Sequence, residues 1–313
     1  MDPAVRPQDD LFRHFAGTWL DTYEIPADRA SDGVSRALYD IAEVQVREII
    51  ETASHSSPNG LKDHRTSGEG EAQKIGDLYR SFMDTDAIKA RGLSPLTADL
   101  AAIDAITDLT SFITTMAQLE TRGLGGIFGA AIYADAMDSS MNIFHIGQGG
   151  ISLPDEAYYR EEQYQPIREA FVAHVQKMGE LAGVPLLANE ILALETEIAS
   201  HHWDQVKDRD ATLTYNKTTR AELEALAPNF HWDLWATNAQ IPSIAFDVLN
   251  IHEPSFFSGL SSMLADFETR REVWVSWLKW NLISGSAAYL TDDLVEQNFA
   301  FYGTTLSGTP KIR

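Results

Sequence analysis

The sequence predicts a mainly α-helical protein with one small β-hairpin. Over most of its 313 residues, apolar side chains recur three and four positions apart, the spacing of a helix with one buried face. The clearest run extends from Gln165 to Ala182, and Gly183 follows it as a candidate helix end. Residues 125–148 are expected to form the hairpin, because two stretches rich in Ile, Phe and Tyr flank turn-forming residues there.

Six further segments carry the helical pattern. In chain order their apolar side chains are Leu38, Ile41 and Ile49; Ile75, Leu78, Tyr79 and Phe82; Leu96, Leu100 and Ile103; Phe112, Ile113, Met116 and Leu119; Leu187, Ile191, Leu194 and Ile198; and Phe267, Trp274, Leu278 and Leu282. We expect the second set to form a buried stripe, and Ser94 with Pro95 to cap and start the third helix. Trp277 and Trp280 lie off the main face of the last helix, so we expect several neighbours around it.

The amino-acid composition disfavours several classes of binding partner and site. The chain has 46 acidic and 24 basic residues, a formal charge of −22, which repels phosphate and makes nucleic acid and anionic membranes poor partners. No apolar run reaches the roughly 18 residues of a membrane span. Cysteine is absent, which removes disulfides and thiolate zinc ligands. No signal peptide is visible, so the cytoplasm is the expected location and export remains open. Residues 54–70 are expected to be disordered.

A search for catalytic motifs finds none. A helical zinc peptidase site needs His-Glu-x-x-His, and His252-Glu253 is followed by Pro254 without a second histidine. Neighbouring helical residues point about 100° apart, so we expect His201 and His202 to form ordinary hydrogen bonds at a helix end rather than share a metal. His174 lies on an apolar stripe and is expected in the core. The sequence therefore predicts no catalytic residue and no metal ligand in this chain.

Several separated blocks resemble the neprilysin and endothelin-converting-enzyme family of zinc metalloendopeptidases. They are DLFRHFAGTWL at 10–20, YRSFMD at 79–84, GISLPDEAYY at 150–159, LETEIA at 194–199 and FAFYG at 299–303. They follow the family's order and cover nearly the whole chain. Phe82 stands where animal members often have cysteine, which fits a bacterial relative without disulfides. The resemblance is to the N-terminal half of the family only.

The resemblance implies a domain plan. Residues 1–35 are expected to reach into the catalytic domain, and residues 36–313 to form a helical domain that closes a peptide cavity, with the hairpin as an insert at 125–148. The catalytic zinc domain is not present in this chain. Zinc is expected in a C-terminal half, which would be the main partner, either as part of the same gene product or as a separate chain. Small peptides are the expected substrates.

The resemblance also points to a substrate-cleft segment between Arg29 and Tyr39. Ser31 stands where animal relatives have an arginine that meets a substrate carboxylate, and Ser35 stands where they have a pocket phenylalanine. Arg29 and Arg36 are close enough in sequence to substitute electrostatically. Exposed arginines at a helix start are the alternative interpretation of both.

The sequence is compatible with three functions. The leading hypothesis is a non-catalytic peptidase half that serves as lid and scaffold and is inactive alone. The alternative is a stand-alone helical module that binds peptides or a partner without catalysis. An unrelated helical enzyme with an acidic site is the third, supported only by the abundance of carboxylates.

Overall fold

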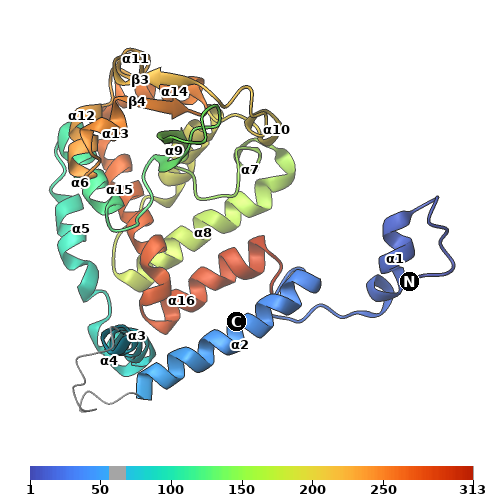
Figure 1. The fold of residues 1–313 in the computed structure, drawn as a ribbon. Coiled ribbons are helices and arrows are strands. Elements are labelled where there is room, and N and C mark those ends of the chain that lie inside the picture. The colour runs from blue at the N-terminus through green and yellow to red at the C-terminus, as the bar shows by residue number, and fades with distance from the viewer. Residues whose placement is uncertain (56–67, 313) are drawn as a thin grey trace. The chain divides into compact units, whose positions relative to one another are not determined.

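The computed structural model describes residues 1–55 and 68–312 and divides into two compact units (Figure 1). Unit 1 comprises Met1–Asp84 and Tyr302–Arg313, and unit 2 comprises Thr85–Phe301. Most of the segment predicted to be disordered lies outside the described residues, and its ends, residues 54–55 and 68–70, are helical. No helix within the described part of the chain combines the length and apolarity needed to cross a membrane.

The described residues of unit 1 form the helices α1 (Leu11–Thr22), α2 (Val34–His55) and α3 (Gly68–Met83). Asp10 begins α1 by accepting a hydrogen bond from the backbone N–H of Arg13. Helices α2 and α3 pack closely at Gly76, where an added Cβ would lie 2.5 Å from the carbonyl oxygen of Ala53. Among the described residues of unit 1, Ala53 is the only buried hydrophobic residue. Unit 1 therefore has almost no core of its own.

Unit 2 holds the remaining helices and the core. Its α-helices are α4 (Thr85–Arg91), α5 (Thr97–Asp104), α6 (Leu109–Glu120), α7 (Ala157–Arg160), α8 (Gln165–Ala182), α9 (Ala188–Ser200), α10 (Gln205–Asp208), α11 (Arg220–Leu226), α12 (Trp232–Asn238), α13 (Ser243–Phe246), α14 (Pro254–Leu264), α15 (Phe267–Ser286) and α16 (Asp292–Phe299). Short helical turns are η1 (Ser94–Leu96), η2 (Glu162–Tyr164), η3 (Ala287–Tyr289) and η4 (Ala300–Leu306), of which the last runs on into unit 1.

Helix α15 has several neighbours in unit 2, as the tryptophans on its different faces predicted. It packs against α5, α6, α8 and α9, and Trp274, Trp277 and Trp280 are all fully buried. The predicted helix over Gln165–Ala182 is confirmed as α8, and Gly183 ends it in the left-handed conformation, with a φ of 64°.

Unit 2 also contains one four-stranded sheet with the strand order β1-β2-β4-β3. The predicted hairpin is confirmed as β1 (Phe128–Ala134) and β2 (Asn142–Gln148), paired antiparallel with Ala131 opposite His145. Two short strands extend it, β4 (Val248–Ile251), parallel to β2, and β3 (Lys217–Thr219), antiparallel to β4. The hairpin is therefore one half of a sheet rather than an isolated insert.

Two local predictions were wrong. Ser94 was expected to occupy the N-cap position of a helix, but it is the first residue of η1. The N-cap position is occupied by Leu93 in η1 and by Leu96 in α5, and neither leucine makes a side-chain capping hydrogen bond. The stripe on α3 is not buried, since Ile75 is 41%, Leu78 73% and Phe82 51% exposed. Helical periodicity identifies the apolar face of a helix, but burial depends on what covers that face.

Two glycines allow a matched test of the loop around the hairpin. Gly150 has a φ of +79°, and an added Cβ would lie 2.9 Å from the carbonyl oxygen of Ile127; Gly123 has a φ of +86° with open space around it. Gly123→Ala is expected to cost about 1–2 kcal/mol from backbone strain alone. Gly150→Ala should cost at least about 1 kcal/mol more, because the strain is joined by a steric clash. Urea unfolding of both variants measures the difference, and equal losses would contradict it.

Candidate functional site

The segment predicted to face a substrate lies in unit 1, between α1 and the first turns of α2. Arg29 is held there by carboxylates of its own chain: its guanidinium lies 3.1 Å from Asp28, 3.6 Å from Asp32 and 3.0 Å from Asp40, and its side chain is 9% exposed. The hydrogen bonds that Arg29 donates to Asp28 and Asp40 raise the pKa of Arg29, and the hydrogen bond that Tyr23 donates to Asp32 lowers the pKa of Asp32. A substrate carboxylate would have to compete with three internal partners for Arg29.

Arg36 and Tyr39 are brought together on the first turns of α2. The guanidinium of Arg36 lies 5.6 Å from the ring centroid of Tyr39, within the range of a cation–π contact. Arg36 is half-buried and Tyr39 is exposed, and Ser31 and Ser35 are exposed as well. Of the two arginines proposed from the sequence, Arg36 is the one not enclosed by several carboxylates.

Unit 1 carries a large exposed apolar surface. Large apolar side chains are exposed on all three helices of the unit and on the segment between α1 and α2: Leu11, Phe12, Phe15, Trp19, Leu20, Tyr23, Ile25, Val34, Leu38, Tyr39, Ile41, Val44, Val46, Ile49, Ile75, Leu78, Phe82 and Met83. Exposed apolar side chains that gather in numbers often mark an interface. We refer to these side chains as the unit 1 apolar surface.

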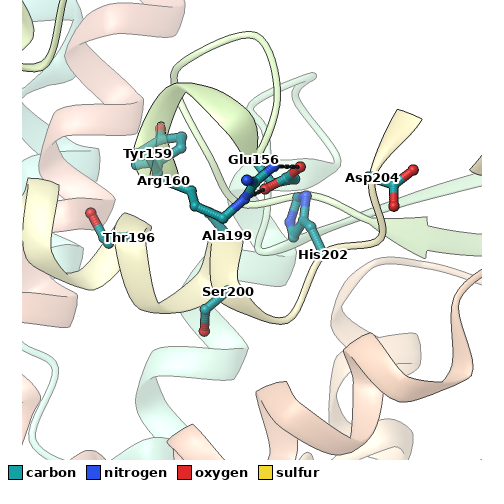
Figure 2. Close-up of a pocket in the computed structure, with 8 residues that line it drawn as sticks. All are labelled: Glu156, Tyr159, Arg160, Thr196, Ala199, Ser200, His202 and Asp204. Carbon is teal, nitrogen blue, oxygen red and sulfur yellow. Dashed lines mark hydrogen bonds and ion pairs between the residues drawn. The ribbon is translucent and has the colours of Figure 1, made fainter. Parts of the chain in front are cut away.

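Unit 2 has a hollow of about 480 Å³ at the end of α9, shown in Figure 2. Arg160 donates two hydrogen bonds of 3.0 Å to Glu156, and Asp204 caps α10 by accepting from two backbone N–H groups. His202 bonds to the carbonyl oxygen of Gly149 at 2.9 Å, as predicted for an ordinary helix-end histidine. The hydroxyl of Ser200 bonds to its own helix. The polar side chains of this hollow thus serve the fold.

A buried carboxylate, Glu195 on α9, anchors the loop that carries residues 150–159. Its oxygens accept hydrogen bonds from the backbone N–H and the hydroxyl of Ser152 (2.9 and 2.7 Å), the hydroxyl of Tyr159 (2.6 Å) and the indole of Trp277 (3.1 Å). Glu195 is completely buried, and this burial raises its pKa to about 7 although the four donors oppose the shift. Two sequence blocks that carry the family resemblance therefore meet at this residue.

The raised pKa of Glu195 predicts a pH dependence of stability. The unfolded chain takes up a proton at the ordinary pKa of 4.5 and the folded chain at about 7, so the contribution of Glu195 is complete below pH 4.5 and is lost as the pH rises to 7. The loss should approach about 3 kcal/mol. Urea unfolding at pH 5 and pH 8 measures it. Glu195→Gln should remove this part of the pH dependence, and an unchanged slope in that variant would contradict the assignment.

No metal centre is present in residues 1–55 and 68–312, since no three His, Asp or Glu side chains there are arranged to hold an ion. His174 lies in the core as predicted, bonded to Gln297 and stacked on Phe301.

Comparison with known proteins identifies the family of this chain. A model of the N-terminal part of peptidases, described as Peptidase family M13, matches residues 7–313. The chain belongs to peptidase family M13. The resemblance to neprilysin and endothelin-converting enzyme predicted from the sequence is thereby confirmed.

Relatives of this M13 chain are much longer than it is. Endothelin-converting enzyme 1 of Bos taurus is 23% identical over 331 residues, which cover 99% of this chain and 42% of the relative. The zinc metalloprotease Zmp1 of Mycobacterium tuberculosis, solved with an inhibitor, is 40% identical with a TM-score of 0.90, over 100% of this chain and 47% of that one. The structure of Zmp1 in its open state gives a TM-score of 0.82 over 99% of this chain and 47% of that one, at the same 40% identity. The M13 chain thus spans slightly less than half the length of its relatives.

Proposed function

We propose that this chain is the N-terminal, non-catalytic half of a zinc-dependent metalloendopeptidase that acts on small peptides. In this proposal unit 1 is the docking part, which packs against a zinc-bearing C-terminal half. Unit 2 is the helical lid and scaffold that closes a peptide cavity. A closed shell of this kind admits small peptides, excludes folded proteins and shields the reacting carbonyl from bulk water.

The observation that carries the proposal is the unit 1 apolar surface. It lies on a unit whose described residues include a single buried hydrophobic residue, in a chain that covers 42–47% of its relatives. Exposing such a surface to water is unfavourable at roughly 25 cal/mol per Å², and a second half of the protein would cover it. The exposed side chains continue beyond residue 35 to Met83, so we extend the docking part from residues 1–35 to the whole of unit 1.

The lid role has a second support. The inhibitor complex of Zmp1 matches this chain with a TM-score of 0.90, and the open state of Zmp1 matches it with a TM-score of 0.82. We infer that parts of the matching half of Zmp1 are arranged differently in the two structures. Closure of a lid over substrate is a common device for excluding water from an enzyme cavity. We assign this closure to unit 2.

For the substrate cleft we retain Arg29, Ser31, Ser35, Arg36 and Tyr39 as candidates, with Arg36 first among them. Its guanidinium lies over the ring of Tyr39, whereas that of Arg29 is enclosed by three carboxylates. A guanidinium beside an exposed aromatic ring suits the C-terminal carboxylate of a short peptide.

Peptide hydrolysis tests the proposed function. The 313-residue chain alone is expected to be inactive. Addition of a separately produced C-terminal half of an M13 enzyme should yield hydrolysis that a zinc chelator abolishes. If the chain binds peptides tightly while no C-terminal half binds to it, the stand-alone binding module is the correct alternative. Chelator-resistant hydrolysis by the chain alone would contradict both.

A further inference from the structure

Strand β1 is an open edge of the sheet in unit 2. It pairs with β2 on one side, and within the described residues its backbone makes no hydrogen bond on the other. The backbone N–H of Asp135 donates a hydrogen bond of 2.9 Å to the carbonyl oxygen of Met141. Along an antiparallel strand, residues whose backbone groups bond to the partner strand alternate with residues whose backbone groups point away from it. It follows that the N–H and C=O groups of Ala130 and Ile132 point away from β2, toward the open side.

This edge lacks the usual protection against pairing. Natural edge strands are commonly blocked by lysine, proline or a bulge, and β1 reads Phe-Gly-Ala-Ala-Ile-Tyr-Ala without charge, proline or irregular register. Most of its residues are exposed, including Gly129, Ala130, Ile132 and Tyr133. The strand can therefore accept another extended segment.

Beside the edge, one face of the sheet is hollowed. The hollow has a volume of about 390 Å³. Gly129 and Ala131 of β1 and Gly147 of β2 contribute to its lining, and they point to the same face because alternate residues of a strand do so. Their small side chains leave room above the sheet for the side chains of an added strand, which would also alternate. Tyr133 follows Ala131 on that face, and its exposed ring gives the hollow an aromatic wall.

One polar side chain of the hollow, that of His145, is incompletely partnered. His145 is 9% exposed, and its Nδ1 lies 3.0 Å from Nε2 of His252. Its own Nε2 is buried with no hydrogen-bond partner in the described part of the chain. A buried polar atom without a partner is uncommon in folded proteins. Nε2 of His145 would be satisfied by a polar group of a ligand.

The charge of the hollow is negative. Asp208 on α10 and Glu253 before α14 line it together with the two histidines. Burial lowers the pKa of both His145 and His252, so both imidazoles are neutral at pH 7. Burial and a hydrogen bond with Asp208 raise the pKa of Glu253 to about 8. Glu253 therefore carries a proton at pH 7, and the hollow offers a basic side chain two neighbouring carboxyl groups.

We propose that β1 and this hollow form a second peptide site, which binds an extended segment with basic side chains at alternate positions as a fifth strand of the sheet. Main-chain hydrogen bonds to Ala130 and Ile132 supply affinity. The basic side chain enters the hollow beside Tyr133 and meets Asp208 and Glu253. The site goes beyond the proposed peptidase function, because binding there needs no zinc and no catalytic half.

Alternate N-methylation of a peptide tests the proposal directly. The probe is a blocked hexapeptide in which arginine alternates with threonine, titrated calorimetrically against the 313-residue chain. If the peptide adds antiparallel to β1, methylation of the threonine amides should weaken binding at least about tenfold, and methylation of the arginine amides should not. If the peptide instead adds parallel to β1, methylation of the arginine amides should weaken binding and methylation of the threonine amides should not. Equal effects of the two methylations, or no binding of the parent peptide, would overturn the proposal.

Substitutions in the protein, rather than in the peptide, test the same contacts. Asp208→Asn should weaken binding of the arginine peptide about threefold to tenfold, and Asp292→Asn, a matched loss of an exposed carboxylate on α16, should not. Ala130→Pro removes the outward N–H and should abolish binding, whereas Ala130→Ser keeps that N–H and should retain it. Binding unchanged in both Asp208→Asn and Ala130→Pro would place the peptide elsewhere.

Discussion

Replacement of Glu195 with alanine is expected to lower the free energy of unfolding of the chain by about 4 kcal/mol. The substitution leaves four donors, from Ser152, Tyr159 and Trp277, buried without an acceptor. It also opens a cavity at a position that is completely buried. The loop over residues 150–159 would lose its anchor to α9. Urea unfolding followed by tryptophan fluorescence measures the loss.

Glu190→Ala is the matched control for this experiment. Glu190 lies on the same helix, is exposed, and should change the unfolding free energy by no more than about 0.5 kcal/mol. The loss of unfolding free energy for Glu195→Gln should lie between these two values. The amide oxygen can still accept hydrogen bonds, but the amide NH2 group would face hydrogen-bond donors. A loss below about 1 kcal/mol for Glu195→Ala would show that the network does not stabilise the folded state.

The double substitution Leu38→Glu and Ile41→Glu is expected to block assembly with a catalytic half. The two side chains are 64% and 56% exposed on α2, so the unfolding free energy of the isolated chain should change by no more than about 0.5 kcal/mol. If the unit 1 apolar surface is buried on assembly, each side chain contributes roughly 1.5–3 kcal/mol there. Affinity for the catalytic half should then fall at least about 100-fold, as measured by sedimentation of the mixed halves.

Arg47→Glu provides the control on the opposite side of α2. Arg47 is exposed and pairs with Glu51, and its charge reversal should leave assembly within about threefold of the parent chain. Binding of a hydrophobic dye to the isolated chain should decrease for the double variant and not for Arg47→Glu. If the double variant unfolds the isolated chain, Leu38 and Ile41 belong to an internal core rather than to a docking surface.

The core helices of unit 2 were predictable from the sequence because their periodicity matches their burial. Helix α8 and its end at Gly183 follow the predicted pattern, and the tryptophans of α15 are buried as expected. Strands β3 and β4 were missed because they have three and four residues, too short for a period of two to show. The exposed stripe on α3 shows the other limit, since a pattern of apolar residues does not say which part of the protein covers it.

The candidate site was only partly predictable. The segment around Arg29 and Arg36 was identified through the family resemblance, but its carboxylates were not. Asp28 and Asp32 lie one and three residues from Arg29, a spacing from which an ion pair can be suspected. Asp40 reaches Arg29 across eleven positions, and that contact depends on the chain path before α2. The hollow beside β1 brings together β2, α10 and the two residues that follow β4, and no local pattern in the sequence predicts that they meet.

The central claim is that this chain works as half of a zinc peptidase. It is tested most directly by the intact mass and zinc content of the protein purified from its source. We expect a polypeptide roughly twice the length of this chain, in line with the share of Zmp1 that it covers, with one zinc ion removable by a chelator. A zinc-free protein of 34.8 kDa that is monodisperse, binds no hydrophobic dye and associates with no second chain would contradict it.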